Sequence, residues 1–392
     1  MSRTKLAKLG TVATISRNGV APEKIADGTL YVGLENIERG GRLVEVREVV
    51  AGELASAKFS FTRQDLLFGK LRPNLGKIAR PNFDGVCSTD ILPLTPGPDL
   101  SRDYLAHFLS QDGMIALAAS RAKGANLPRL SPSDLAQFEI PLPPIEQQRR
   151  IADVLDRADA LRAKRREALA LLDDLTQSIF LDMFGSARDR RLWSISTLAE
   201  LLAGIDSGKS PVCLSRPAND GEWGVLKLGA VSRRRYLPEQ HKALPEGVKP
   251  AAEDEVNAGD LLMVRKNTLD LVGACALVGS TPAHLLLPDL IFRLRLRNQA
   301  PVQKRYLHRA LCQDDVRGQI RSLAGGSAGS MPNISKARLS TVRLSIPPPE
   351  LQDVFGARVE LVEEEKAVQS LHLDQIDALF ASLQQRAFAG EL

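Results

Sequence analysis

Residues 203–210 (AGIDSGKS) have the glycine, lysine and serine of a phosphate-binding loop, with alanine in place of the first glycine. Read literally, this pattern predicts ATP hydrolysis, because the backbone N–H groups of such a loop hold phosphates and its lysine contacts them. Such a loop opens a helix, however, and Pro211 and Pro217 interrupt the residues that follow. The related residues 16–22 lack the Gly-Lys-Ser sequence. We therefore interpret residues 203–210 as a turn and not as an ATPase site.

The spacing of cysteines and histidines gives no sign of a metal site. The four cysteines, Cys87, Cys213, Cys275 and Cys312, form no CxxC pair, and the five histidines form no HExxH or HxH motif. The chain also lacks an NPPY-type methyltransferase motif and a glycine-rich cofactor fingerprint after a strand. Residues 325–330 (GGSAGS) are interpreted as a surface loop. We expect buried thiols, no metal, no cofactor and no catalysis by this chain.

Clusters of lysine and arginine are the chemistry that the sequence does support. Such side chains neutralise phosphates and release counterions, and arginine binds guanine through two hydrogen bonds. The candidate DNA-binding residues are Arg63, Lys70, Arg72, Lys77, Arg80 and Lys123, with Phe61, Phe68 and Asn74 among them, and Arg233, Arg234, Arg235, Arg265 and Lys266, beside Asn267. Taken singly, each is equally well explained as a solvated surface charge. Lysine and arginine contact both bases and phosphates, so the sequence does not divide the candidates into base-reading and phosphate-binding residues.

Three further arginines share one face of a predicted strand. Arg293, Arg295 and Arg297 alternate with Leu294 and Leu296, and alternate residues of a strand point the same way. That face would lie against solvent or against phosphate, and the sequence favours neither.

Charge alternates along the chain in four blocks. Residues 1–145 have 18 basic and 15 acidic side chains (net +3), and residues 186–349 have 24 and 15 (net +9). Residues 146–185 have 7 and 8 (net −1), and residues 350–392 have 3 and 9 (net −6). We interpret 1–145 and 186–349 as two basic globular domains, 146–185 as a central helical spacer and 350–392 as a C-terminal helical spacer.

An internal repeat supports this division. Residues 128–184 align without a gap on residues 332–388, and 13 of the 57 pairs are identical, among them Pro143/Pro347, Glu146/Glu350, Gln148/Gln352 and Phe184/Phe388. Upstream the copies need insertions: Tyr104-Leu105 matches Tyr306-Leu307, and residues 65–67 match 260–262. The chain is therefore two units of about 190 to 200 residues, with one scaffold and divergent interiors.

The elements of each unit follow from periodicity and punctuation. Strand-like runs at 85–94 and 285–296 lie among Gly and Pro residues, and helical stretches are predicted near 102–119 and 304–323. Each domain ends in a strand-like segment, 138–142 or 342–346, which stops at prolines. We predict a mixed α/β (α+β) fold.

A long helix follows the prolines in each copy, because Pro favours a first helical turn and Glu146 or Glu350 complements the helix dipole. The first helix should run to about Phe184. The apolar residues of its predicted heptad seam are Ile151, Val154, Ala158, Leu161, Ala168, Leu172, Leu175 and Ile179. The two helices are expected to pack as an antiparallel coiled coil between the domains. The alternative is that each helix only caps its own domain.

The junction residues carry a family resemblance. The sequence FEIPLPPIEQQRRIADVLDRADAL at 138–161, the following LLDDLTQSIFLDMFG, and LFASLQQRAFAGEL at 379–392 resemble specificity subunits of Type I restriction-modification systems. The resemblance covers essentially the whole chain. It implies two target-recognition domains, each of which reads one half of a bipartite site in double-stranded DNA, while the helices set the unread spacer.

The resemblance also implies partners. Two methyltransferase subunits would dock on the helical regions and bring S-adenosylmethionine, and endonuclease/translocase subunits, which use ATP and Mg, would join them. The candidate docking residues are Glu146, Gln147, Gln148, Arg149, Glu350 and Gln352. The second junction departs from the first, because Leu351 replaces Gln147 and the basic pair Arg149-Arg150 is missing.

Two other classes of function compete with this reading. A stand-alone bipartite DNA-binding regulator would bind DNA without a methyltransferase. A coiled-coil scaffold is disfavoured, because the two globular blocks together carry +12 and the helices −7. No apolar run is long enough to span a membrane and no signal peptide opens the sequence, so the expected location is cytoplasmic.

Overall fold

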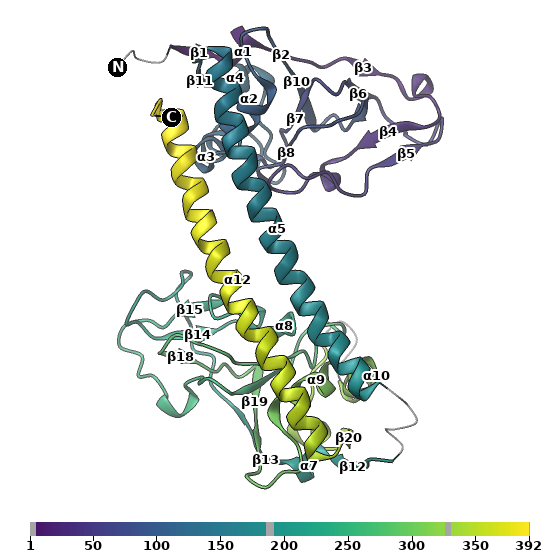
Figure 1. Cartoon of the computed structure of the whole chain (residues 1–392), viewed down its shortest axis with the longest axis vertical. Coiled ribbons are helices and arrows are strands. Elements are labelled where there is room, and N and C mark those ends of the chain that lie inside the picture. Colours follow the sequence, from purple (N-terminus) through teal and green to yellow (C-terminus); the bar gives the residue numbers. More distant parts are fainter. Residues whose placement is uncertain (1–4, 186–191, 326–330, 392) are drawn as a thin grey trace. The chain divides into compact units, whose positions relative to one another are not determined.

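The computed structural model describes residues 5–185, 192–325 and 331–391. It divides into two compact units: unit 1 comprises residues 1–168 and 369–392, and unit 2 comprises residues 169–368. Each unit therefore contains a globular domain and one segment of each long helix, α5 (Ile145–Phe184) and α12 (Pro349–Ala389) (Figure 1). The predicted mixed α/β (α+β) fold is confirmed in each unit.

Unit 1 holds three sheets within its described residues. The antiparallel pair is β1 (Leu6–Lys8) and β11 (Glu139–Pro141). The four-stranded sheet has the order β2 (Ala13–Ile15), β10 (Ile91–Pro96), β7 (Leu66–Gly69), β8 (Ile78–Ala79). The five-stranded sheet has the order β3 (Gly19–Val20), β6 (Lys58–Phe61), β9 (Gly85–Cys87), β4 (Thr29–Val32), β5 (Arg47–Val49). Its helices are α1 (Leu9–Val12), α2 (Arg102–Leu109), α3 (Asp112–Arg121) and α4 (Pro132–Ala136), with 3-10 turns η1 (Pro22–Lys24), η2 (Leu34–Asn36) and η3 (Pro73–Leu75).

Unit 2 repeats the scaffold. The pair β12 (Ser194–Thr197) and β20 (Arg343–Ile346) corresponds to β1 and β11. The sheet β13 (Leu202–Ser207), β19 (Ile291–Leu296), β16 (Leu261–Val264), β17 (Cys275–Leu277) corresponds to the four-stranded sheet of unit 1. The third sheet differs and has the order β15 (His241–Ala243), β14 (Gly224–Leu226), β18 (Leu285–Leu286). The helices are α7 (Leu198–Leu201), α8 (Gly229–Ser232), α9 (Lys304–Cys312), α10 (Asp314–Leu323) and α11 (Lys336–Leu339), with η4 (Ala252–Asp254).

The helical stretches predicted near 102–119 and 304–323 are each two helices. Gln111 separates α2 from α3, and Gln313 separates α9 from α10, because each glutamine has an extended backbone with ψ of 140° or 148°. The break turns the second helix of each pair onto a new axis, which the continuous apolar pattern did not indicate.

Both long helices complete the core of each unit. In unit 1, Ile151 and Leu155 of α5 and Ala387 of α12 are buried in one cluster with Tyr104 and Leu135. In unit 2, Phe180 and Phe184 of α5 and Phe355 of α12 are buried with Tyr306 and Leu307. Aromatic rings make these contacts, as in the pairs Phe388–Tyr104 and Phe184–Tyr306, with centroids 5.1 and 4.9 Å apart.

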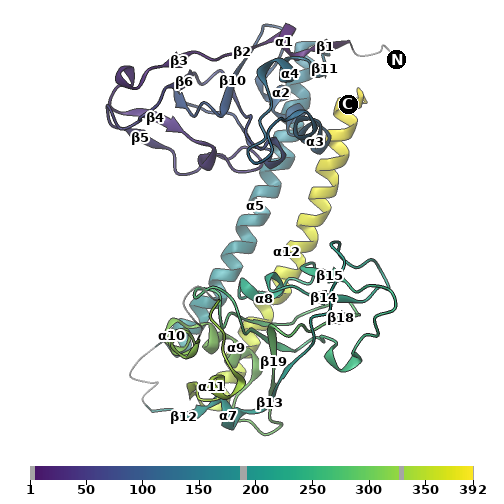
Figure 2. The same cartoon turned by 180° about the vertical axis from the view of Figure 1, so that it is seen from behind.

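Within each unit the two helix segments run antiparallel (Figures 1 and 2), which confirms the predicted pairing. The pairing is largely polar: Arg162 Nε contacts Asp377 Oδ1 at 2.5 Å in unit 1, and Lys366 Nζ contacts Asp173 Oδ1 at 2.8 Å in unit 2. These two ion pairs occupy equivalent positions in the repeat, and each joins α5 to α12.

The predicted heptad seam is wrong at three of its residues. Val154, Leu161 and Leu175 are exposed, while Ile151 and Ala158 are buried. The physical reason is that the helices bury apolar residues against their domain cores, and the face between the helices is bridged by charged side chains.

Gln148 and Gln352 fasten each domain to its long helix. In unit 1, Gln148 Oε1 accepts from the N–H of Ser101 at 2.9 Å, and its Nε2 donates to the carbonyls of Asp99 and Pro143 at 2.9 and 2.8 Å. In unit 2, Gln352 makes the equivalent bonds to Gln303, Pro301 and Pro347, at 2.8 to 2.9 Å.

Both glutamines are buried and their amides are fully bonded within the chain. Their predicted role as partner-docking residues is therefore wrong: a side chain without exposed surface cannot contact a partner. Gln148 and Gln352 are identical in the repeat because both join a domain to its long helix through the same hydrogen bonds.

Replacing Gln148 by Leu should destabilise unit 1 by on the order of 3 kcal/mol, because one buried N–H and two buried carbonyls lose their partners. The melting temperature of the full chain, followed by calorimetry, measures this loss. Gln375→Leu makes the same chemical change at an exposed position of α12 and should have little effect. Equal effects of the two substitutions would contradict the fastening role.

Candidate nucleic-acid interface

Two basic segments of unit 1 are held together in what we call clasp 1, residues 70–75 with residues 123–129. The first segment leaves β7, and its backbone pairs with the second: Arg72 N–H donates to Pro128 O at 2.8 Å, and Leu130 N–H donates to Lys70 O at 2.9 Å. Lys123 and Arg129 exchange two backbone hydrogen bonds of 2.8 and 2.9 Å, which close the second segment into a loop. The structure therefore brings Lys70, Arg72 and Lys123 to one place.

The backbone of clasp 1 is shaped by its sequence. Arg72 has a left-handed conformation (φ 49°, ψ 61°), Pro73 begins η3, and Gly76 ends it at φ 60°. A Cβ on Gly76 would lie 2.9 Å from Ile115 Cδ1, so glycine allows the turn to pack on α3. A left-handed arginine is uncommon and costs free energy, and such strain is typical of functional sites.

The side chains of clasp 1 leave positive charge in solvent. Within the described residues, neither Lys70 nor Lys123 has an ion pair, and Arg72 only donates to the carbonyl of Asn126 at 3.4 Å. Residues 123–127 are exposed. Arg129 differs, because Asp90 binds its guanidinium through two contacts of 2.8 and 3.2 Å. Clasp 1 is thus a solvent-facing cationic loop suited to a polyanion.

Two other candidates of unit 1 are engaged inside the chain. Arg63 binds Asp84 at 3.2 Å and also donates its backbone N–H to that carboxylate at 2.8 Å. The Nζ of Lys77 donates to the carbonyl of Leu34 at 2.5 Å. Among the described residues, these contacts do not join either side chain to clasp 1, and DNA contact by Arg63 or Lys77 stays a prediction.

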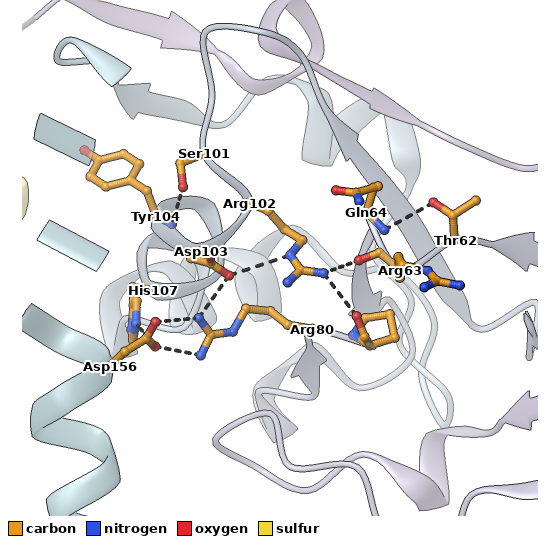
Figure 3. Close-up of polar contacts among 11 residues, drawn as sticks. Thr62, Arg63, Gln64, Arg80, Ser101, Arg102, Asp103, Tyr104, His107 and Asp156 are labelled. Carbon is orange, nitrogen blue, oxygen red and sulfur yellow. Dashed lines mark hydrogen bonds and ion pairs between the residues drawn. The ribbon is translucent and has the colours of Figure 1, made fainter. Parts of the chain in front are cut away.

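Arg80 is the most strongly engaged candidate (Figure 3). Its guanidinium lies between Asp103, at 3.1 Å, and Asp156 of α5, which it contacts at 2.7 and 3.0 Å. His107 Nε2 lies 2.9 Å from the same Asp156 carboxylate. Burial alone would raise the pKa of Asp156, but hydrogen bonds from His107 and Arg80 hold it well below the usual range. Arg80 therefore joins the domain of unit 1 to the long helix.

Unit 2 contains the corresponding clasp 2, residues 265–270 with Gly325 and residues 331–333. Ile334 N–H donates to Arg265 O at 3.0 Å, Asn267 N–H donates to Pro332 O at 3.2 Å, and Gly325 and Asn333 exchange backbone hydrogen bonds. The remainder of the predicted glycine-rich loop, 326–330, lies outside the described residues.

Clasp 2 also lies beside the arginine run that follows α8. The buried Asn267 donates its Nδ2 to Ser232 Oγ at 3.2 Å, and Arg233, Arg234 and Arg235 come directly after Ser232. Arg235 contacts Asp173 at 3.6 Å. Lys266, Arg233 and Arg234 have no ion pair in the part of unit 2 that the structure describes. The structure therefore links both basic clusters that the sequence singled out in this unit.

The sequence did not show that the equivalent positions 129 and 333 have different roles in the two clasps. Arg129 in clasp 1 is bound by Asp90, whereas its counterpart Asn333 in clasp 2 accepts a 3.1 Å hydrogen bond from Arg265 Nε. Arg265 also packs over the Phe292 ring at 5.6 Å, so this candidate supports clasp 2. The gap-free alignment of 129 with 333 was the available signal.

The neighbouring strands β13 and β19 decide two questions that the sequence raised. Residues 202–207 form β13, and no helix follows it directly, so the predicted turn is wrong for most of this segment but the rejection of an ATPase loop is confirmed. Arg293 and Arg295 of β19 face Asp206 of β13 at 3.6 and 2.8 Å. Arg297 lies beyond the strand and donates to the Ala199 carbonyl at 3.3 Å. These arginines meet groups of their own chain.

The first turns of α5 carry the remaining docking candidates of unit 1. Glu146 and Arg149 are exposed and contact each other at 2.7 Å. A cavity of about 440 Å³ is lined by Glu146, Gln147, Arg150, Ile151 and Val154. In unit 2 the counterparts of Gln147 and Arg150 are the exposed apolar residues Leu351 and Val354, and Glu350 is also exposed. The two junctions therefore present different surfaces.

No group of three metal-binding side chains comes together within the described residues. Over the same residues, no helix has the length and apolar character needed to cross a membrane.

Comparison with known proteins gives consistent matches. Residues 5–171 match the family model of the Type I restriction modification DNA specificity domain. The chain is 30% identical to the Type I restriction enzyme EcoEI specificity subunit of Escherichia coli over 196 residues, which cover 48% of this chain and 33% of that relative, so the match spans about a third of the relative's length. It is 24% identical to the EcoKI specificity subunit of Escherichia coli (strain K12), over 81% of this chain and 72% of that relative.

Solved structures share the fold over the whole chain. The Type-I restriction-modification system S subunit from M. genitalium has a TM-score of 0.57 and 13% identity, and covers 98% of this chain and 96% of its own. A chain from a structural study of complex assembly in the type I R-M system has a TM-score of 0.54 and 22% identity, with 99% of this chain and 98% of its own covered.

The Asp156 contacts predict an acid dependence of stability. Because the folded state lowers the pKa of Asp156 below the ordinary 3.8, its contribution is present at neutral pH and is lost as pH falls below that value. Asp156→Asn should lower the melting temperature at pH 7 by several degrees, and the difference from the wild type should shrink below about pH 4. The matched control is Asp153→Asn, an exposed carboxylate of the same helix. A difference independent of pH would argue against the ionised pair.

Proposed function

Because this chain belongs to the specificity subunits of Type I restriction-modification systems, we propose that it reads a bipartite site in double-stranded DNA, one half with each unit. The observation that carries this proposal is the repeated clasp. Each unit presents cationic side chains next to the same sheet, on a turn that a second loop holds in place. Clasp 1 offers Lys70, Arg72 and Lys123, and clasp 2 offers Lys266 with Arg233 and Arg234.

The divergence between the clasps supports two different half-sites. The scaffold positions repeat, as the fastening glutamines show, whereas the exposed residues of the two clasps differ in type and charge. The two helices would fix the unread spacer, since α5 has 40 residues and a helix rises about 1.5 Å per residue, about 60 Å in all.

Catalysis would be supplied by partners and not by this chain. Two methyltransferase subunits carrying S-adenosylmethionine would dock on the helix junctions, where Glu146, Arg149 and Glu350 are exposed and Gln147 lines the cavity at the start of α5. Endonuclease/translocase subunits, with ATP and Mg, would join that assembly. The apolar pair Leu351 and Val354 would make the second junction more hydrophobic than the first.

Deletion of this gene from cells that also have its neighbouring methyltransferase gene should remove methylated adenines from one bipartite motif with a fixed gap. Genome-wide mapping of methylated adenines, with and without the gene, measures the change. Restoring the gene on a plasmid is the control. Specific DNA binding by the chain alone, with an unchanged methylation map, would instead identify a stand-alone regulator.

Neutralising clasp 1 should weaken DNA binding through lost phosphate contacts. For Lys70→Gln/Lys123→Gln, the slope of log affinity against log salt should fall by about 0.9 for each lost contact. The control double variant Lys8→Gln/Lys24→Gln removes two exposed lysines elsewhere in unit 1, so it lowers the net charge by the same two units. Fluorescence anisotropy with labelled duplex DNA measures both slopes. Identical slopes would exclude clasp 1 from the interface.

A further inference from the structure

A buried arginine of unit 2 lacks a counter-ion. The side chain of Arg317, on α10, is 1% exposed. Its Nη2 donates to the carbonyl of Asp270 at 2.6 Å and lies 3.5 Å from that of Val272. Its Nε and Nη1 are buried without a hydrogen-bond partner, and no carboxylate of the described residues forms an ion pair with it. A buried guanidinium in this state costs free energy.

The fold itself does not require a charge at this position. The corresponding residue of unit 1 is Ile115, on α3, which packs against the turn at Gly76. An apolar side chain thus fills the same place in the same scaffold. The shared scaffold therefore does not by itself explain the charge of Arg317.

Two more arginines lie near Arg317 without ion pairs among the described residues. Arg321 follows one turn later on α10, and its Nε is also buried and unpartnered. Arg234 is exposed, and its backbone is left-handed (φ 58°) at the end of α8. Burial, followed by the charges of Arg234 and Arg321, lowers the pKa of Arg317.

A continuous set of contacts connects these arginines to clasp 2. Ser232, two residues before Arg234, accepts from Asn267 Nδ2 at 3.2 Å. Asn267 leads into the turn whose carbonyls at Asp270 and Val272 receive the hydrogen bonds of Arg317. The turn therefore contacts both Ser232 at the end of α8 and Arg317 of α10, and it follows directly after Lys266.

We propose that Arg234 and Arg321 bind a phosphodiester group of the DNA backbone, and that Arg317 is a positioning residue which holds the turn at residues 268–272 behind this site. The inference rests on the proposed function and deepens it, because it adds Arg321 and Arg317, which the sequence did not single out, to the candidate Arg234. The phosphate supplies the negative charge that the cluster lacks, and residues 186–349, with a net charge of +9, favour a polyanion.

The test uses the full chain and a labelled duplex of random sequence at salt concentrations from about 50 to 200 mM KCl. In the wild type, affinity falls steeply over this range. In Arg234→Gln/Arg321→Gln, the fall should be about three- to fourfold smaller for each lost contact. The control is Arg358→Gln, a change at an exposed arginine of α12, which should leave the slope unchanged.

Arg317→Met replaces the buried charge by an apolar side chain, as Ile115 does at the corresponding position of unit 1. Its melting temperature should equal or exceed that of the wild type, because an uncompensated buried charge is removed. Its DNA affinity should fall all the same, because the turn loses its support. If Arg317→Met does not fold, the charge is needed for structure alone; that result overturns its assigned role, and the double variant still tests the phosphate contact.

A thermal-shift measurement with inorganic phosphate distinguishes a site for the DNA backbone from a site for a free phosphate ion. Slopes for Arg234→Gln/Arg321→Gln that match those of Arg358→Gln overturn the inference while leaving DNA binding, and the proposed function, intact. If the double variant loses only a thermal shift caused by inorganic phosphate, the site takes a free anion and the assignment to DNA is wrong. A wild-type chain that binds no DNA contradicts the proposed function itself, and with it this inference.

Discussion

Burial of apolar residues from both long helices in each domain core is the constraint on which the rest of the structure depends. A long amphipathic helix is marginal in water by itself, and its stability comes mostly from packing. Here α5 contributes Ile151 and Leu155 to one core and Phe180 and Phe184 to the other. Each globular domain is therefore incomplete without segments that are remote in sequence, and each compact unit combines two stretches of chain.

Polar contacts fix how each domain joins its long helix and how the two helices pair. Gln148 and Gln352 satisfy backbone groups where the chain turns from domain into helix, and such buried groups are costly when left unpaired. Arg162–Asp377 and Lys366–Asp173 give each helix pair a charged contact instead of a leucine seam. Hydrogen bonds and ion pairs thus help to specify the scaffold. Because charged side chains join the two helices, Val154, Leu161 and Leu175 are not covered by a leucine seam and stay exposed.

A fixed scaffold allows the same position to do different work in the two units. Ile115 fills a space in unit 1 that Arg317 fills in unit 2, and Arg129 is bound by Asp90 where Asn333 supports Arg265. Arg63 and Arg80, which look like DNA contacts in the sequence, are held by Asp84, Asp103 and Asp156. Only some of the basic side chains in each cluster are therefore without an acidic partner among the described residues.

The sequence by itself determined the repeat, the two long helices, the mixed α/β class and the family resemblance, because these depend on periodicity and on residues adjacent in the chain. It also located the clusters that form the clasps, since Lys70 and Arg72, or Arg265 and Lys266, are neighbours along the chain. The tertiary structure alone decided which arginines are free, which glutamines are buried and which helix face is covered. The physical reason is that these outcomes depend on partners that are remote along the chain, such as Asp84 for Arg63, 21 residues away, and Asp377 for Arg162, 215 residues away. The local sequence does not encode such contacts.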